Sequence, residues 1–220
     1  MLTHRERDEA MPITTLIADD HALVREGLRS LLAAHASIDV VGFAANGREA
    51  VREALRLRPE VVLMDISMPE LNGIDATRQL LDRHPPAKVI ILSMHATIEH
   101  YYRAVRAGAR GYLLKESASE EIAEAVRTVH VGRQFLSRKI TARFQPASGT
   151  DTPLDSLSRR EREILQLVAE GHCSAKIGAL ICISPKSVET YRSRLMQKLG
   201  MRGMPDMVKF AIRHGLTSLD

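Results

Sequence analysis

Four short apolar runs in the first half of the chain each end at isolated polar residues. Uninterrupted runs of this length are typical of strands that are covered on both faces in a parallel sheet. The carboxyl ends of such strands lie at one edge of the sheet, which is where ligands bind. The polar groups are therefore expected to converge at that edge: Asp19 and Asp20 after residues 13–18, Asp65 after 61–64, Ser93 after 89–92 and Lys115 after 111–114.

Between these runs, apolar residues follow the spacing of helices that bury one face. The stripes lie within residues 23–32, 50–55, 74–81 and 122–129. Strands that alternate with such helices predict an α/β fold with a doubly wound sheet of five parallel strands.

The residues at the sheet edge have a specific chemistry. Three carboxylates in one crevice repel each other unless a dication lies among them, and Mg²⁺ prefers carboxylates while it keeps several waters. The ammonium of Lys115 can pair with the central carboxylate or with a phosphoryl group, to which the Ser93 hydroxyl can donate. This set predicts that Asp65 attacks phosphorus and forms an aspartyl phosphate.

Residues 13–130 resemble the receiver domain of two-component response regulators. The resemblance runs through four stretches: IADDH (17–21), VVLMDISMPELNG (61–73), VIILSMH (89–95) and AGARGYLLK (107–115). It implies a CheY-like, flavodoxin-like fold, a sensor histidine kinase as partner and Mg²⁺ as cofactor.

Carried over position by position, the resemblance implies a role for each polar group. Asp65 would be the phosphoacceptor, Ser93 and Lys115 would contact the phosphoryl group, and Tyr112 would be the switch aromatic. The Mg²⁺ ligands would be Asp20, Asp65, the backbone carbonyl of Ser67 and, mostly through water, Asp19.

Some of these residues have a plainer interpretation. An Asp after a strand is often a loop or N-cap residue, and Tyr112 alone fits a half-buried packing residue. We expect neither His21 nor His95 to bind the metal, because Mg²⁺ prefers oxygen. His95 remains a candidate for setting the lifetime of the phosphoryl group.

Length favours two domains, and composition favours a cytoplasmic protein. The 220 residues exceed the usual single domain, which has about 100–150 residues. No apolar run reaches the ~18 residues of a membrane span, so we expect no membrane partner. The two cysteines, Cys173 and Cys182, lack CxxC spacing and indicate a reduced chain without a zinc site.

The domain boundaries follow from changes in pattern. Residues 1–11 are charged and lack the apolar segment of a signal peptide, so we expect a disordered extension or a true start at Met11. The receiver would cover 12–131, an aperiodic linker 132–153, and a second domain 154–220. The net charge is −2 over 12–130 but +4 over 154–220, which suggests that the second domain meets a polyanion.

The second domain is helical in pattern. Ser158 and Glu161 form the sequence signature of a capping box, and Gly171 marks the end of that first helix. Further helices are expected over about 174–181, 185–199 and 205–214, with Ser184 as N-cap. Two short helices joined tightly, the second rich in Lys and Arg, predict an all-α four-helix domain with a helix-turn-helix.

Residues 154–216 resemble the LuxR/NarL type of DNA-binding domain, so that the whole chain resembles a NarL/FixJ-family response regulator. The resemblance rests on LSRREREILQLVAEG (157–171), ISPKSVETYRSRLMQKLG (183–200) and FAIRHGL (210–216). It implies a phosphorylation-controlled transcription factor that binds promoter DNA as a homodimer, with RNA polymerase as a further candidate partner.

Geometry separates the faces of the second helix of this motif. Val188, Leu195 and Leu199 should pack inward. Three outward residues could contact base edges: Glu189, Thr190 and Ser193. The residues expected to contact phosphates are Lys186, Ser187, Arg192, Arg194 and Lys198. Without the motif, this charged face would be interpreted as merely solvated.

One stretch departs from the family pattern. SAKIGALICIS (174–184) carries Lys176, Gly178, Ala179 and Leu180 where charged or helix-favouring residues are usual. A helical Gly costs up to ~1 kcal/mol relative to Ala, so the stability of this helix and its phosphate contacts is in question.

Two other classes of function compete with this interpretation. A phosphatase of the haloacid-dehalogenase type would need an acid where Ser67 stands. A phosphorylation-independent regulator with a vestigial receiver is the closer rival. We expect no enzyme activity beyond slow self-dephosphorylation.

Overall fold

The computed structural model describes residues 11–94, 97–117, 119–141 and 153–217. Its first domain is built on a parallel sheet of six strands in the order β2-β1-β3-β4-β5-β6. The strands are β1 (Ile13–Ala18), β2 (Ile38–Ala44), β3 (Val61–Asp65), β4 (Lys88–Ser93), β5 (Gly111–Leu114) and β6 (Phe135–Leu136). The doubly wound sheet with the five expected strands is confirmed.

The sixth strand was not predicted. β6 has two residues, pairs with Gly111 and Tyr112 of β5, and is followed by the short helix α6 (Arg138–Thr141). Two residues are too few to show an alternating pattern, and the sequence pattern therefore places this stretch in the linker. Residues 135–141 instead extend the sheet domain, while residues 1–10 and 142–152 lie outside the described part of the chain.

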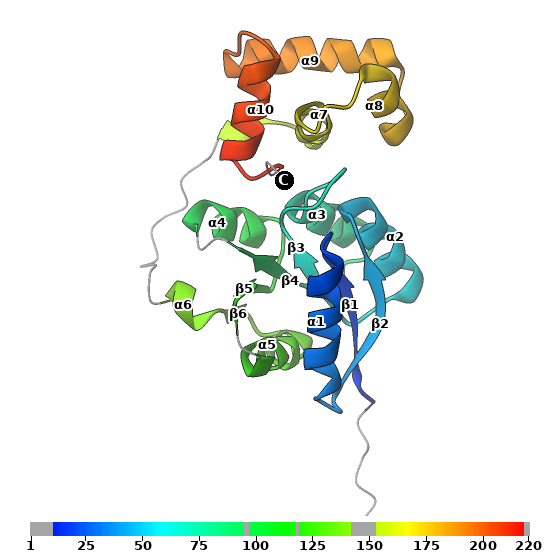
Figure 1. Cartoon of the computed structure of the whole chain (residues 1–220), viewed down its shortest axis with the longest axis vertical. Coiled ribbons are helices and arrows are strands. Elements are labelled where there is room, and N and C mark those ends of the chain that lie inside the picture. The colour runs from blue at the N-terminus through cyan, green and yellow to red at the C-terminus, as the bar shows by residue number, and fades with distance from the viewer. Residues whose placement is uncertain (1–10, 95–96, 118, 142–152, 218–220) are drawn as a thin grey trace, which may run out of the picture.

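Helices cover both faces of the sheet (Figure 1). Packed on one face are α1 (Ala22–Ala33) and α5 (Ser119–His130). The other face carries α2 (Gly47–Leu57), α3 (Gly73–Arg83) and α4 (Ile98–Arg106). Alternate residues of each central strand enter these two cores, which explains why the strands are apolar throughout.

The second domain consists of a 3₁₀ turn η1 (Pro153–Ser156) and four helices around a core of its own. The helices are α7 (Arg159–Ala169), α8 (Ser174–Ile181), α9 (Pro185–Leu199) and α10 (Met204–Arg213). The expected capping box of Ser158 and Glu161 is present, and Ser184 caps α9. Gly200 ends α9 with a positive φ of 64°, a conformation that glycine adopts without strain.

The unusual α8 forms despite its glycine. A Cβ atom at Gly178 would lie 2.6 Å from the carbonyl oxygen of Ile183. The turn into α9 therefore passes so close to α8 that only glycine fits at this position. The helix-favouring residue that the family pattern led us to expect would collide with that turn.

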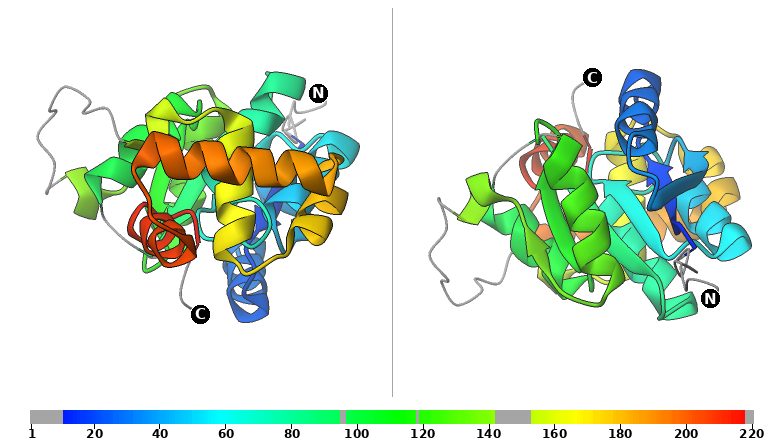
Figure 2. Two further views of the ribbon diagram at one scale, coloured as in Figure 1. Left: turned by 90° about the horizontal axis from the view of Figure 1, so that it is seen from above. Right: turned by 90° about the horizontal axis from the view of Figure 1, so that it is seen from below.

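Helix α7 is the helix of the second domain that faces the sheet domain, and α9 lies on the far side of α7 from the sheet (Figures 1 and 2). All eight residues from 161 to 168 are buried, although four of them are polar. One side of α7 contributes to the helical core, and the other side faces the receiver-like domain. Within the described residues, no helix has the length and apolar character of a bilayer span.

Candidate functional site

The predicted acidic pocket is present at the carboxyl edge of the sheet. Ligand atoms of Asp19, Asp20, His21 and Asp65 all lie within 4.8 Å of one another. Asp19 and Asp65 are buried, whereas Asp20 is exposed at the rim. Gly73 allows the loop after β3 to close beneath the site, because a Cβ there would lie 1.8 Å from the Asp65 carbonyl oxygen.

Lys115 provides the cation in this pocket. Its Nζ lies 2.7 Å from Oδ2 of Asp19 and 2.9 Å from Oδ2 of Asp65. These two buried oxygens receive no well-aligned hydrogen bond within the described chain. Burial lowers the pKa of Lys115, but the charges of Asp65 and Asp19 outweigh it and leave that pKa above its ordinary value.

The pocket has an excess of negative charge. Burial raises the pKa of Asp65 to about 6 against the opposing effect of Lys115, and the charge of Asp19 adds to the rise. Three carboxylates thus lie in a pocket with one lysine, whose ammonium pairs with only two of them, Asp19 and Asp65. A hard dication that accepts oxygen ligands would supply the missing positive charge, and the donor set therefore fits Mg²⁺.

His21 turns toward the acids rather than away from them. Its Nδ1 lies 2.8 Å from Oδ1 of Asp20 and 3.4 Å from Oδ1 of Asp19. Its backbone N–H donates to Oδ1 of Asp19, and the guanidinium of Arg25 donates to the Asp19 carbonyl. The loop after β1 is thus held by its own acidic residues.

Ser93 and Tyr112 lie on the neighbouring strands β4 and β5, where Tyr112 pairs with Ile91 and Ser93 pairs with Leu114. Both are buried, and a hydrogen bond joins their hydroxyl groups. Burial raises the pKa of Tyr112 to about 12, so the phenol is neutral. The Tyr112 ring meets Tyr101 of α4 edge-on, with 5.9 Å between ring centroids. Ser67 is half-buried two residues after Asp65, and His95 lies outside the described residues.

On α9, the expected inward and outward faces are found. Val188 and Leu195 are fully buried, and Leu199 packs partly against the same core. The outward residues fall into two classes. Exposed side chains are Lys186, Glu189, Thr190, Ser193, Arg194 and Lys198, and half-buried ones are Ser187 and Arg192.

Several of these side chains already have partners within the domain. Glu189 hydrogen-bonds to Ser174 of α8 and pairs with Arg192 at 3.0 Å. Nζ of Lys198 lies 3.0 Å from Oε2 of Glu161 in the capping box of α7. Lys198 is therefore turned toward α7, whereas Arg194 makes no ion pair with the described residues and is better placed for a phosphate.

Two further hydroxyl groups on α9 bond locally. Thr190 donates to the carbonyl of Lys186, and Ser187 lies 2.8 Å from the hydroxyl of the N-cap residue Ser184. Ser193 has no such partner among the described side chains. Of the three predicted base-reading residues, Ser193 is thus the one without an internal hydrogen bond to another described side chain, whereas Glu189 and Thr190 each have one internal partner or more.

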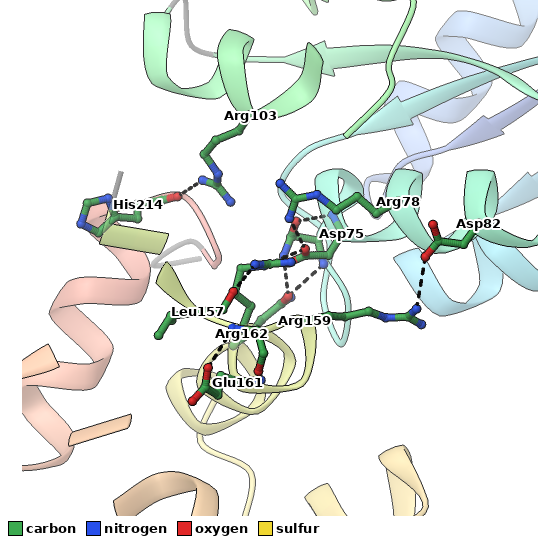
Figure 3. A network of polar contacts seen from close by, with 12 residues as sticks. Asp75, Arg78, Asp82, Arg103, Leu157, Arg159, Glu161, Arg162 and His214 are labelled. Carbon is green, nitrogen blue, oxygen red and sulfur yellow. Dashed lines mark hydrogen bonds and ion pairs between the residues drawn. The ribbon is translucent and has the colours of Figure 1, made fainter. Parts of the chain in front are cut away.

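The sequence did not predict the interface between the two domains (Figure 3). Nε of Arg162 on α7 lies 3.0 Å from Oδ1 of Asp75 on α3. The Gln166 amide donates to the Met68 carbonyl and accepts from both the backbone and the side chain of Asn72. Polar residues such as Arg162 and Gln166 are equally typical of an exposed helix face. The sequence pattern therefore does not indicate that they are buried.

A second group of contacts joins α4 to the other end of the helical domain. Arg103 donates to the His214 carbonyl (Figure 3). Nδ1 of His214 lies 2.9 Å from Oε1 of Glu99. Arg106 pairs with Asp155 of η1 at 2.8 Å. The helix that packs beside Tyr112 is thus itself in contact with the second domain.

Comparison with known proteins identifies both halves of the chain. Residues 15–127 match the response regulator receiver domain, and residues 155–211 match the bacterial regulatory proteins of the luxR family. A phosphoacceptor domain joined to a helix-turn-helix domain defines a phosphorylation-dependent, DNA-binding transcription regulator. The chain belongs to the NarL/FixJ-type response regulators of two-component systems.

Individual relatives match along nearly the whole chain. Response regulator GacA of Pseudomonas aeruginosa is 38% identical over 209 residues, covering 93% of this chain and 97% of the relative. Oxygen regulatory protein NreC of Staphylococcus aureus is 36% identical, covering 91% and 97%. Among solved structures, response regulator ChrA of a heme-sensing two-component system covers 93% of this chain and 98% of its own, with 32% identity and a TM-score of 0.52.

Proposed function

We propose that this response regulator is phosphorylated on Asp65 by a sensor histidine kinase. The observation that supports the assignment is the convergence of Asp65, Asp19 and Lys115 at ion-pair distance, with two buried carboxylate oxygens short of hydrogen bonds. In the reaction, a carboxylate oxygen of Asp65 bonds to phosphorus. The phosphorus–nitrogen bond of the kinase phosphohistidine breaks, and its electron pair returns to the imidazole.

Mg²⁺ would be held by the carboxylates of Asp20 and Asp65, by the backbone carbonyl of Ser67 and, mostly through water, by Asp19. When bound, it neutralises charge on the phosphoryl oxygens. Lys115 already touches Asp65 and can keep its ion pair with the product. Ser93 donates to a phosphoryl oxygen.

We infer that Tyr112 senses this change through Ser93. Once Asp65 is phosphorylated, the phosphoryl group and the Tyr112 hydroxyl would compete for the hydrogen bond of the Ser93 hydroxyl. Tyr112 packs on Tyr101 of α4, and α4 contacts the helical domain through Arg103. Phosphorylation would therefore alter the contact between the domains.

In the second domain, α9 would enter the major groove of DNA. Arg194 and Lys186 would contact phosphates, and Ser193, with Thr190 and Glu189, would read bases. Ser187, Arg192 and Lys198 would add phosphate contacts once released from their internal partners. A homodimer would occupy two half-sites, because one helix-turn-helix reads few base pairs.

The remaining expectations belong to the same proposal. Cys173 and Cys182 are free, as expected for work in the reducing cytoplasm. RNA polymerase is a candidate partner at the promoter. We infer no enzyme activity beyond slow self-dephosphorylation, which labelled phosphoprotein would reveal as a slow loss of label.

The decisive experiment is phosphorylation of Asp65→Asn by a small phosphodonor with Mg²⁺, followed on phosphate-affinity gels. The variant should remain folded and take no label on the receiver, whereas Asp39→Asn, which changes an exposed acid on β2, should be labelled like wild type. Stable labelling of Asp65→Asn would contradict the assignment.

A second experiment separates the main alternative, a regulator whose DNA binding ignores phosphorylation. Phosphorylated wild type should sediment as a dimer on its selected DNA site and bind it more tightly than unphosphorylated protein. Equal affinity for both forms, with a monomer on the DNA, would favour the alternative.

A further inference from the structure

A cavity of about 480 Å³ lies between the two domains. Its size falls in the range of pockets that hold small molecules, which is about 300–1,000 Å³. Both domains contribute to its walls. The sheet domain supplies Arg48, Gln79 and Arg83, and the helical domain supplies Arg159, Arg160, Glu163, Leu180, Ile181 and Cys182.

The charge of this cavity is strongly positive. Four arginines face a single carboxylate, that of Glu163, which leaves a net charge of three positive units among the lining residues. Oε1 of Glu163 lies 2.6 Å from Nη2 of Arg48, and Oε2 lies 2.7 Å from Nη1 of Arg160. One carboxylate is thus shared by two guanidinium groups.

The other two arginines are less satisfied. Arg83 makes no ion pair with any described residue. Nη1 of Arg159 lies 3.6 Å from Oδ2 of Asp82, whose side chain is 67% exposed (Figure 3). Arg83 and Arg159 come from opposite domains, so an anion between them would neutralise charge on both sides of the cavity.

A buried amide adds an independent sign of a ligand. Gln79 is 6% exposed, and its Nε2 atom has no hydrogen-bond acceptor in the described part of the chain. Buried donors in proteins are almost always paired. An acceptor oxygen in the cavity would pair with this amide.

The remaining wall is apolar. Leu180, Ile181 and Cys182 form the end of α8 and the turn after it. An anion alone would leave this wall facing water, whereas a ligand with a flat apolar part would cover it. The cavity therefore combines a phosphate-binding side with a side suited to a ring.

We propose that this cavity binds a small phosphorylated molecule of the nucleoside diphosphate class. The guanidinium groups of Arg83 and Arg159 bind the phosphates, since arginine matches phosphate oxygens in a bidentate geometry. The amide of Gln79 donates to a phosphate oxygen, and the base lies against Leu180 and Ile181. The two or three negative charges of such a ligand match the net charge of the cavity.

The ligand would join the two domains. Because it contacts residues of both, it binds the arrangement seen here better than a separated one, and it stabilises that arrangement by mass action. This site is distinct from the acidic pocket and requires neither phosphorylation nor Mg²⁺. Its test is therefore independent of the proposed function.

The test is calorimetric titration of the full-length protein with ADP in Mg²⁺-free buffer that contains a chelator. Wild type should bind one ADP. Arg83→Ala and Arg159→Ala should each weaken binding at least about tenfold, as expected for loss of a charged phosphate contact. Arg52→Ala, which removes an exposed arginine of α2 outside the cavity, should bind like wild type.

Two further probes separate the parts of the ligand. Adenosine should not bind, because it lacks phosphates, and inorganic diphosphate should bind more weakly than ADP, because it leaves the apolar wall uncovered. Diphosphate binding as tight as ADP would overturn the nucleoside assignment. Absence of saturable ADP binding up to about 1 mM, where even weak sites fill, or equal binding by the Arg83, Arg159 and Arg52 variants, would overturn the site itself.

Discussion

Two buried carboxylates on neighbouring elements have opposite surroundings. Asp65 and Asp75 are each 2% exposed. Asp75 accepts hydrogen bonds from Arg78, Asn72 and Arg162, so each of its oxygens has a donor. Asp65 shares one lysine with Asp19 and lacks a well-aligned donor at Oδ2.

The difference separates a structural role from a chemical one. A fully hydrogen-bonded carboxylate such as Asp75 joins the two domains through Arg162. Its negative charge is also stabilised by the helix dipole, because Asp75 lies in the first turn of α3. A buried ionised carboxylate without enough donors, such as Asp65, lowers the stability of the fold until a cation or a phosphoryl group binds to it. Three predictions test this contrast, beginning with the largest expected effect, and a fourth tests the outward face of α9.

Removal of the partner of the satisfied acid should be the most damaging change. Arg162→Ala should lower the free energy of unfolding by about 3–5 kcal/mol, as for other broken buried ion pairs. Urea denaturation measures this loss. Arg194→Ala, an exposed arginine in the same domain, should stay within about 0.5 kcal/mol. A loss below about 1 kcal/mol for Arg162→Ala would mean that Asp75 is fully satisfied within its own domain.

Neutralisation of the unsatisfied acid should instead stabilise the protein. Burial raises the pKa of Asp65 from 3.8 to about 6, so the folded state holds this proton more tightly than the unfolded state. Ionisation above pH 6 therefore costs folding free energy. Asp65→Asn should gain about 2–3 kcal/mol near pH 7.5 without Mg²⁺.

The pH dependence provides the control for that variant. The gain should shrink as pH falls from about 6 to about 4, because wild-type Asp65 is then protonated in the folded state. Thermal unfolding across this range checks the trend. A gain that is independent of pH would show that the charge of Asp65 is not the cause.

Binding of Mg²⁺ should also offset the loss of folding free energy caused by the ionised Asp65. Wild type should be stabilised by about 2.7 kcal/mol when Mg²⁺ is present at 100 times its dissociation constant. Asp20→Ala removes a ligand at the exposed rim and should lose most of this response, which thermal shift assays can follow. Asp39→Ala should respond like wild type. Equal responses of both variants would contradict the ligand set.

The smallest effect concerns α9. Arg194→Ala should reduce the salt dependence of DNA binding by about one unit per lost phosphate contact, without changing the preferred sequence. Lys198→Ala should have a smaller effect, because Lys198 pairs with Glu161. Ser193→Ala should alter the preferred sequence by about 1–3 kcal/mol at one position. Binding selections at several salt concentrations distinguish these outcomes.

The sequence predicted those features that depend on neighbours along the chain. The strand runs, the Ser158 and Ser184 caps and the polar groups at strand ends all follow from local rules, and the topology then brings Asp19, Asp65 and Lys115 together. β6 was too short for its pattern to be visible.

The interdomain features could not be predicted in this way. Arg162 and Gln166 look like ordinary solvent-facing residues of an amphipathic helix, and Arg83 and Arg159 like ordinary surface charges. Their role depends on which faces of two separate domains meet. That choice is made by shape and charge across the interface rather than by any local pattern.

The composition of α7 bears on whether the domains can part. Its side toward the sheet domain carries polar residues, namely Arg159, Arg162, Glu163, Gln166 and the C-cap residue Glu170, whereas its apolar residues remain inside the helical core. If the two domains separated, these α7 side chains would exchange hydrogen bonds to protein for hydrogen bonds to water. Separation would not expose an apolar surface of α7 that could promote aggregation. The helical domain can leave its partner and return as an intact unit.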